Sequence, residues 1–314
     1  MTAALLVGGG LRVVDDYPVP EPSAEDALLR VRVAGFCGTD IEMMRGYAGE
    51  GDLRICGHEF VASVVGDEAR RVVAAINYVP GEPGLDARHH PHRRVIGIRE
   101  HDGAFAQYLC VPRANLVTVP DGVPDELAVF AEPLAAALRI GEQLPISTGA
   151  EIAVVGPGRL GMLIAWALAE AGAAVTLLGR SDTSLELGRR WGIATGLTQD
   201  QPADRWPMVV EASGTPGGVE AALRLLRPCG QLVLKSTWSA RAADPPDLSL
   251  LVVKEIRVQG SRCGPMDAAL RQLESGSPFA DMIDGRFPLS RAAQGAEFAQ
   301  QRGVRKVLLD VAQD

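Results

Sequence analysis

The feature that most constrains the fold is the segment AVVGPGRLGMLIA, in which three glycines stand between an apolar strand-like run and an apolar helix-like run. Gly156, Gly158 and Gly161 have the spacing GxGxxG, with Arg159 and Leu160 in the same turn. Such glycines permit a tight turn, close approach of a pyrophosphate and close helix–strand packing, while the helix N-terminus supplies amides to the phosphates. In this strand–turn–helix context the pattern predicts a dinucleotide site.

The pattern of apolar and turn-forming residues changes near residue 130. Beyond it, apolar runs such as EIAVVG (151–156) and AVTLLG (174–179) alternate with segments of helical period. This alternation is typical of a doubly wound parallel α/β sheet. The first 130 residues instead carry short β-type runs broken by glycine and proline, and this texture returns near the end. Because 314 residues exceed the usual size of a single core, we expect two domains.

Composition excludes several partners. The net charge of −8 argues against binding to nucleic acid or to an anionic membrane. The longest apolar stretch, 162–178, contains Glu170 and Gly172, so it is interpreted as a buried helix and strand rather than a membrane span. The five cysteines show no close pairing and no charged leader precedes the first apolar run, so we expect a cytoplasmic protein.

The end of the second strand of the α/β region predicts the cofactor. NAD sites usually place Asp or Glu there to bind the ribose 2′-hydroxyl. The segment VTLLGRSD instead has Gly179, Arg180 and Ser181, with Asp182 on the following helix. An arginine in place of the carboxylate suits a 2′-phosphate, so the pattern favours NADP over NAD. The alternative is a surface Arg180 that only stacks on adenine.

The segment RHHPHRRV (88–95) contains three of the five histidines and invites a metal-site interpretation. On a strand, His90 and His92 share a face that His89 does not, and Pro91 stiffens the segment. We therefore interpret these histidines as solvated loop residues.

Three short motifs elsewhere carry metal-ligand residue types: GFCGTD at 35–40, CGHEF at 56–60 and FAEPLAAA at 130–137. Singly, each has a structural explanation, because a lone cysteine is commonly a small buried apolar residue and a lone histidine can be a satisfied turn residue. Together with GxGxxG and the terminal return to β texture, they resemble the zinc-dependent medium-chain dehydrogenase/reductase family of alcohol, polyol, sugar and threonine dehydrogenases.

The resemblance extends through nearly the whole chain. It implies a GroES-like β-rich catalytic domain at 1–133 and 264–314 and a Rossmann domain at 134–263. It also implies an oxidoreductase that transfers hydride between NAD(P)(H) and a small alcohol or polyol, or the corresponding aldehyde or ketone.

By matching motifs, Cys37 and His58 resemble ligands of a catalytic zinc, with Glu132 as the third ligand, as in the polyol and sugar branches. Glu59 resembles a second carboxylate that can ligate zinc or exchange with water. Three protein ligands with an open fourth position are what a catalytic zinc requires. Asp40 would orient His58.

The same matching extends to the proton path and the cofactor. Thr39 resembles the hydroxyl that passes the alcohol proton outward. Glu42 stands where many relatives have a relay histidine, and it is either a proton carrier or only a surface carboxylate. Cofactor contacts are expected from strand-end residues and from two arginines that resemble phosphate contacts or are surface residues: Ser213, Ser236, Thr237, Arg262 and Arg305.

Relatives with a second, structural zinc hold it on four cysteines, but residues 60–102 contain none, so the resemblance implies one catalytic zinc and no structural zinc. Two other interpretations stay open: a zinc-free quinone or enone reductase of the same superfamily, and a non-catalytic nucleotide-binding sensor or subunit. The family further implies a homodimer or homotetramer, with GQLVLKST as a candidate edge strand.

Overall fold

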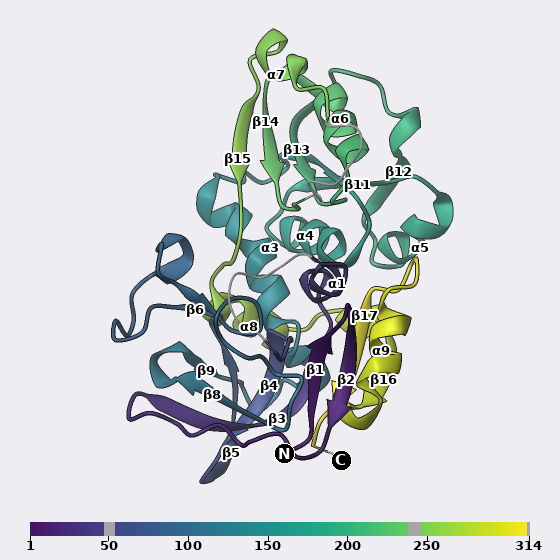
Figure 1. Cartoon of the computed structure of the whole chain (residues 1–314). Coiled ribbons are helices and arrows are strands. Elements are labelled where there is room, and N and C mark those ends of the chain that lie inside the picture. The colour runs from purple at the N-terminus through teal and green to yellow at the C-terminus, as the bar shows by residue number, and fades with distance from the viewer. Residues whose placement is uncertain (47–53, 238–245, 313–314) are drawn as a thin grey trace. The chain divides into compact units, whose positions relative to one another are not determined.

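The structure, a computed structural model, describes residues 1–46, 54–237 and 246–312 of the chain. The chain divides into two compact units, seen in Figure 1. The β-rich unit contains Met1–Glu132 and Met266–Asp314, and the α/β unit contains Pro133–Pro265. None of the described helices is long and apolar enough to cross a membrane.

The α/β unit is built on a six-stranded sheet in which all neighbouring strands are parallel, in the order β12-β11-β10-β13-β14-β15. The order reverses between β10 and β13, which defines the switch point where ligands bind in such sheets. The strands are β10 (Glu151–Val155), β11 (Ala174–Gly179), β12 (Ala194–Leu197), β13 (Trp206–Glu211), β14 (Leu226–Leu234) and β15 (Arg257–Gly260).

Helices cover the strands of this sheet as a doubly wound fold requires, and the predicted fold class is confirmed. Ile152, Ala153 and Val154 of β10 are fully buried, which explains why the strand is a continuous apolar run. α4 packs on β10 and β11, α5 on β11 and β12, and α6 on β13 and β14. The helices are α3 (Ala131–Gln143), α4 (Arg159–Glu170), α5 (Asp182–Arg190), α6 (Pro216–Leu225) and α7 (Ser249–Val253).

The interpretation of GQLVLKST as an edge strand was wrong. Its residues 230–234 belong to β14, which pairs with β13 on one side and with β15 on the other. The edge strand is β15, whose four residues RVQG are too short and too polar to stand out as a strand.

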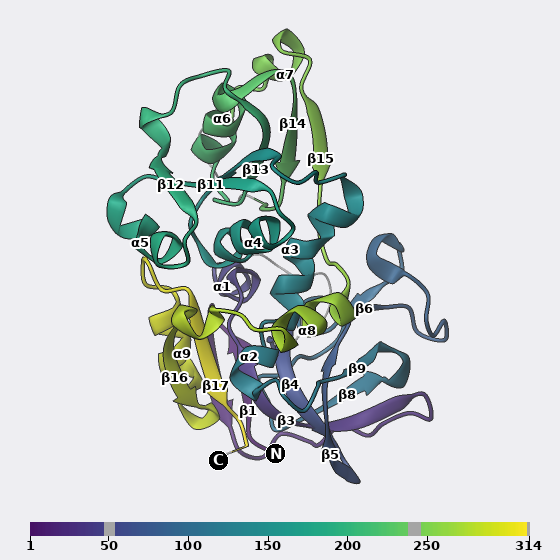
Figure 2. The same cartoon turned by 180° about the vertical axis from the view of Figure 1, so that it is seen from behind.

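The β-rich unit contains a seven-stranded sheet in the order β16-β17-β3-β4-β5-β9, with β8 also paired to β3. The first strand, β1, and the last strand, β17, both belong to this unit (Figure 2). Its strands are β1 (Ala3–Val7), β2 (Gly10–Val14), β3 (Asp26–Gly35), β4 (Glu59–Val64), β5 (Asp67–Ala74), β6 (Asn77–Tyr78), β7 (Arg94–Val95), β8 (Tyr108–Pro112), β9 (Leu116–Thr118), β16 (Ile283–Pro288) and β17 (Lys306–Asp310), and its helices are α1 (Gly38–Met44), α2 (Asp125–Ala128), α8 (Met266–Glu274) and α9 (Ala292–Ala299).

The register of three strands brings distant motifs together. Gly35, the last residue of β3, lies opposite Glu59, the first residue of β4. β17 pairs with the other side of β3, with Leu308 opposite Gly35, so Lys306 reaches the same end. The residues that follow β3 therefore meet the residues that begin β4 and β17.

Candidate functional site

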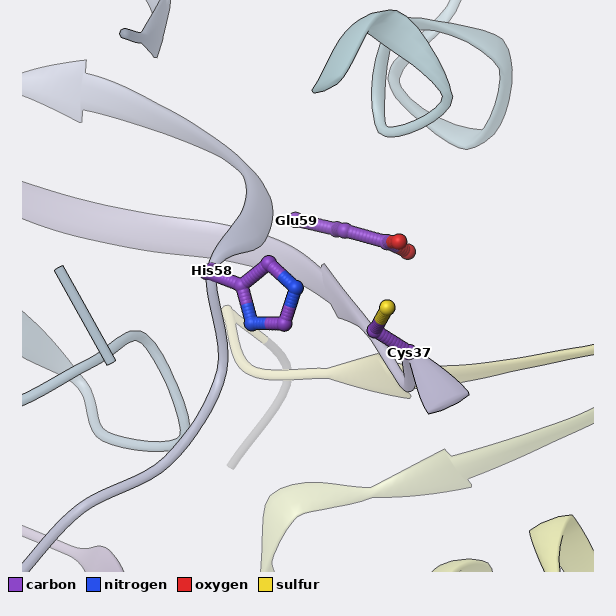
Figure 3. A group of neighbouring side chains, drawn as sticks. All are labelled: Cys37, His58 and Glu59. Carbon is purple, nitrogen blue, oxygen red and sulfur yellow. The ribbon is translucent and has the colours of Figure 1, made fainter. Parts of the chain in front are cut away.

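A group of potential metal ligands forms at this end of the β-rich sheet. The ligand atoms of Cys37, His58 and Glu59 all lie within 4.8 Å of one another, and the three side chains point toward a common centre (Figure 3). Cys37 is the N-cap residue of α1, and His58 and Glu59 stand at the start of β4. Thiolate, imidazole and carboxylate are the donors that zinc prefers in proteins, so this set, with His58 and Glu59 buried and Cys37 half-buried, fits a zinc ion.

Asp40 holds the two segments that carry these ligands. Its carboxylate is fully buried and accepts hydrogen bonds from the backbone amides of Cys37, at 2.8 Å, and Gly57, at 3.1 Å. Its Oδ1 atom also lies 3.5 Å from Nδ1 of His58, which is too long for a good hydrogen bond but close enough for charge attraction. Asp40 therefore fixes the spacing of Cys37 and His58 through the backbone.

Neighbouring charges control protonation at the site. Burial alone would lower the pKa of His58, but Asp40 and then Cys37 outweigh it and raise that pKa well above 6.5. Burial, followed by the charge of Glu59, raises the pKa of the Cys37 thiol. A divalent cation that binds here must therefore compete with protons on both groups.

Lys306 is a residue of this site that sequence reasoning missed. Its Nζ atom forms an ion pair with Oε2 of Glu59, and the two side chains are only 4% and 2% exposed. The ammonium also lies 4.9 Å from the centre of the Phe130 ring. A Cβ atom on Gly35 would lie 3.2 Å from the Glu59 carboxylate and 3.3 Å from the Lys306 ammonium, so glycine leaves room for the pair. The available signal was a single lysine at the start of the apolar run VLL.

Other predicted residues of the metal site lie nearby or on the surface. The Cys37 thiol donates to Oγ1 of Thr39 at 3.8 Å, so this hydroxyl adjoins the ligand group. Glu42 forms an ion pair with Arg45 at 3.0 Å, and both side chains are about half exposed. Glu132 lies in the first turn of α3 and is not among the residues grouped within 4.8 Å.

The GxGxxG turn has the geometry of a phosphate cradle. Gly156 has φ +106°, and a Cβ atom there would lie 2.7 Å from the backbone of Ser213. A Cβ atom on Gly161 would lie only 1.8 Å from the carbonyl oxygen of Gly156. Gly158, the N-cap of α4, faces open space within 4 Å. Backbone atoms thus block the Cβ positions of Gly156 and Gly161, while the Cβ position of Gly158 is open. This arrangement fits a pyrophosphate bound against the turn.

The end of β11 lacks the carboxylate of an NAD site, because Gly179 stands there and side chains pack closely around it. A Cβ atom on Gly179 would lie 2.7 Å from Oγ of Ser184. Arg180 follows and is exposed, and Ser181 is the N-cap of α5. Asp182 is the first residue of α5, and its carboxylate forms an ion pair with Arg189.

The end of β13 contains a buried carboxyl group that sequence reasoning also missed. Glu211 is fully buried, and its Oε1 atom accepts hydrogen bonds from the Ser213 amide at 2.6 Å and from the Ser213 hydroxyl at 2.5 Å. Burial raises the pKa of Glu211. The carboxyl group therefore fixes Ser213 beneath Gly156. A lone Glu after PMVV was the only sequence signal.

The remaining predicted cofactor residues lie at strand ends. Ser236 and Thr237 follow β14, and the Arg262 carbonyl, after β15, accepts a hydrogen bond from Lys235. Arg305 belongs to the β-rich unit, where its backbone amide donates to the carboxylate of Asp284.

Similarity to known proteins covers both units. Residues 23–121 match the family Alcohol dehydrogenase GroES-like domain, and residues 152–260 match the family Ketopantoate reductase PanE/ApbA. The L-threonine 3-dehydrogenase of Bacillus licheniformis is 27% identical over an alignment of 331 positions that covers 93% of each chain. A structure from Sinorhizobium meliloti, described as a zinc-binding dehydrogenase bound to NADP, is 26% identical with a TM-score of 0.87 and covers 99% of both chains. An alcohol dehydrogenase from Thermus sp. ATN1 is 25% identical with a TM-score of 0.84, over 99% of this chain and 100% of that one.

The chain is a zinc-dependent medium-chain dehydrogenase/reductase. The resemblance inferred from the ordered motifs is thereby confirmed, and so is a GroES-like β-rich unit combined with a Rossmann-type sheet.

In this medium-chain dehydrogenase/reductase, the roles of individual side chains stay predictions. The grouped ligands Cys37, His58 and Glu59 agree with the family interpretation, whereas Glu132 lies outside the residues grouped within 4.8 Å and Glu42 pairs with Arg45. The histidines of RHHPHRRV do not form such a group among the described residues: the backbone amide of His92 donates to Nδ1 of His90 at 3.2 Å.

Proposed function

We propose that this protein is a zinc-dependent oxidoreductase that transfers hydride between NADP(H) and a small alcohol or polyol, or the corresponding aldehyde or ketone. The observation that carries the proposal is the group of half-buried Cys37 and buried His58 and Glu59, in a chain that also has the glycine cradle at 156–161. One unit then provides the metal ligands and the other provides the nucleotide site.

Cys37 and His58 would hold the zinc ion, with Glu132 as the third ligand and Glu59 as an alternative carboxylate ligand. When bound, zinc supplies a Lewis acid that polarises the substrate oxygen and lowers the pKa of an alcohol toward neutrality. Asp40 keeps the imidazole of His58 and the thiol of Cys37 in place through the hydrogen bonds described above.

Thr39 is proposed to receive the alcohol proton on its hydroxyl, because this hydroxyl adjoins the Cys37 sulfur. The next carrier is proposed to be solvent. The ion pair of Glu42 with Arg45 favours a surface role for that carboxylate over a role as proton carrier.

NADP is proposed as the preferred cofactor for a steric and an electrostatic reason. Gly179 stands where an NAD site has the carboxylate that binds the ribose 2′-hydroxyl, and a side chain there would crowd its neighbours. The exposed Arg180 can pair with a 2′-phosphate. The similar Sinorhizobium structure is bound to NADP. Arg180→Ala should weaken binding of NADP more than tenfold and leave binding of NAD within about twofold. Equal losses for both cofactors would contradict the role of Arg180.

The function is tested by metal analysis combined with a substrate screen. We expect about one zinc per chain. With NADP, a panel of L-threonine, vicinal diols, polyols and simple alcohols should contain at least one substrate. Zinc and cofactor binding without turnover of any of these, or of the matching carbonyls with NADPH, would favour a non-catalytic nucleotide-binding subunit. Failure to bind zinc would favour the zinc-free reductase branch.

Assembly and location form the last part of the proposal. Among the described residues β15 ends this side of the sheet, and Val258 in β15 and Val252 and Val253 in the preceding α7 are exposed. We therefore propose a homodimer formed edge to edge through β15. Val258→Lys should yield monomers by light scattering, and an unchanged mass would contradict this interface. A cytoplasmic location agrees with the five free cysteines.

A further inference from the structure

The first turn of α5 carries a carboxylate beside the residue proposed to bind the 2′-phosphate of NADP. Asp182 is the first residue of α5 and comes two positions after Arg180, so the two Cα atoms are at most about 7 Å apart. Both side chains are exposed. A phosphate that pairs with Arg180 therefore binds close to a negatively charged group of the protein.

Arg189, near the end of the same helix, holds this carboxylate. Its Nη2 atom forms an ion pair with Oδ1 of Asp182, and its Nη1 atom donates to the carbonyl oxygen of Asp182 at 3.3 Å. Its Nε atom donates to the hydroxyl of Thr195, in β12, at 3.2 Å. Seven residues are about two helical turns, so the two side chains share one face of α5. Because the planar guanidinium has three acceptors, it is held in one orientation, unlike most exposed ion pairs.

The ion pair matters for only one of the two nicotinamide cofactors. NADP carries a phosphate, with up to about two negative charges, where NAD has a neutral 2′-hydroxyl. An Asp182 carboxylate without its cation would repel this phosphate and would have no comparable effect on the hydroxyl. With Arg189 beside it, the charge of Asp182 is locally balanced.

We propose that Arg189 is a specificity-determining residue that favours NADP over NAD by balancing the charge of Asp182 beside the 2′-phosphate. This inference rests on the proposed function, because it requires the 2′-phosphate to bind at Arg180. Arg189 acts through Asp182 and needs no contact with the cofactor. It is therefore a positioning residue, and removal of the Asp182 charge should make it dispensable.

The size of the effect follows from Coulomb's law for exposed charges. In water, a unit charge about 6 Å from a doubly charged phosphate changes a dissociation constant on the order of tenfold when salt is absent. At an ionic strength of about 0.15 M, where the Debye length is about 8 Å, the same charge changes it about threefold. The contribution of Arg189 should therefore shrink as salt is added, which a purely structural role would not explain.

Arg139 in α3 provides a matched control in the same unit. It forms an ion pair with Glu142 at 2.7 Å, and this pair also joins two side chains of one helix. Arg139→Met changes the net charge of the protein by the same amount as Arg189→Met. It leaves the residues at the end of β11 and the start of α5 untouched.

The experiment measures dissociation constants of NADPH and NADH by fluorescence titration at low salt for the wild type, Arg189→Met, Asp182→Asn, the double variant and Arg139→Met. We expect the NADPH constant to rise about fivefold in Arg189→Met and to fall about threefold in Asp182→Asn. The double variant and Arg139→Met should stay within about twofold of the wild type. NADH affinity should not weaken more than about twofold in any variant.

Three outcomes would overturn the inference. They are an unchanged NADPH constant in Arg189→Met, an equal loss in Arg139→Met, and a double variant as weak as Arg189→Met, in which case Arg189 would bind the phosphate directly. If Arg189→Met does not fold, Asp182→Asn decides alone, because an unchanged NADPH constant there also contradicts the proposal.

Failure of the proposed cofactor site gives a different result. In that case Arg180→Ala would leave the NADPH constant unchanged, and the 2′-phosphate would bind elsewhere. If Arg180→Ala weakens NADPH binding as expected while Arg189→Met does not, the cofactor site stands and only the role of Arg189 is refuted.

Discussion

Lys306 in the β-rich unit and Lys235 in the α/β unit are both ammonium groups held at the end of a sheet, but their partners differ. Lys306 pairs with the carboxylate of Glu59, whereas Lys235 donates to two carbonyls and a hydroxyl. The carboxylate neutralises the charge of Lys306 within a buried pair, whereas the carbonyl and hydroxyl acceptors of Lys235 position its ammonium by hydrogen bonds. At the metal site the Lys306 charge is therefore balanced by Glu59 before any ion arrives.

The largest effect should come from breaking the balanced pair. Lys306→Met leaves the Glu59 carboxylate buried without its cation, so we expect a loss of about 3 to 5 kcal/mol in the free energy of unfolding of the metal-free protein, measured in urea. The double variant Lys306→Met/Glu59→Leu should recover most of this loss. Unfolding of Lys306→Met within about 1 kcal/mol of the wild type would contradict a buried ionised pair.

A second prediction tests whether the two units work independently. Cys37→Ser removes a proposed metal ligand and should weaken zinc binding more than about a hundredfold, beyond the effect expected for groups that only orient a ligand. NADPH affinity should stay within about twofold, because the cradle belongs to the other unit. Cys110→Ser in β8 is the matched control, with zinc content unchanged. Loss of NADPH binding in Cys37→Ser would show that the sites depend on each other.

The reciprocal prediction concerns the cradle. Gly161→Ala would place a Cβ atom 1.8 Å from the Gly156 carbonyl oxygen, so the turn must shift. We expect the NADPH dissociation constant to rise about tenfold or more with zinc content unchanged. Gly141→Ala, in α3 with open space at its Cβ position, should change neither quantity. Normal NADPH affinity in Gly161→Ala would argue against this turn as the phosphate site.

The smallest effect should come from Lys254, whose ammonium donates to carbonyls at the end of α6 and pairs with Asp204 at 2.7 Å. Lys254→Met should lower the free energy of unfolding by about 1 kcal/mol, the size expected for a cation at a helix C-terminus. Thermal unfolding of the protein without cofactor measures this change. A loss as large as that of Lys306→Met would mean that the carbonyl acceptors and the exposed Asp204 together matter as much as the buried Glu59 carboxylate.

The sequence was sufficient for features that depend on local periodicity. The apolar run before Gly156 and the helical period after it predicted β10 and α4, because burial on both faces of a parallel strand imposes that pattern. Family motifs also predicted Cys37, His58 and Glu59, which the fold brings into one group.

Features that depend on register could not be predicted from sequence. Lys306 and Glu59 are 247 positions apart, and they meet only because β17 and β4 both pair with β3 at the same end. The edge strand was misjudged for a related reason, since β15 has no apolar run of its own. Glu211 was not predicted, because its contact with Ser213 depends on the turn that follows β13.

The three lysines of the chain stand at 235, 254 and 306, and each has its ammonium engaged by hydrogen bonds or an ion pair. The other cationic side chains are arginines, which acylating reagents do not attack. Amine-directed labels, cross-linkers and activated supports should therefore react poorly with the folded protein. The amine of Met1 is engaged in the same way, since it donates to the Tyr17 carbonyl oxygen at 2.7 Å. Chemistry that couples lysine-rich enzymes readily through their amines should therefore attach this protein only sparingly while it stays folded.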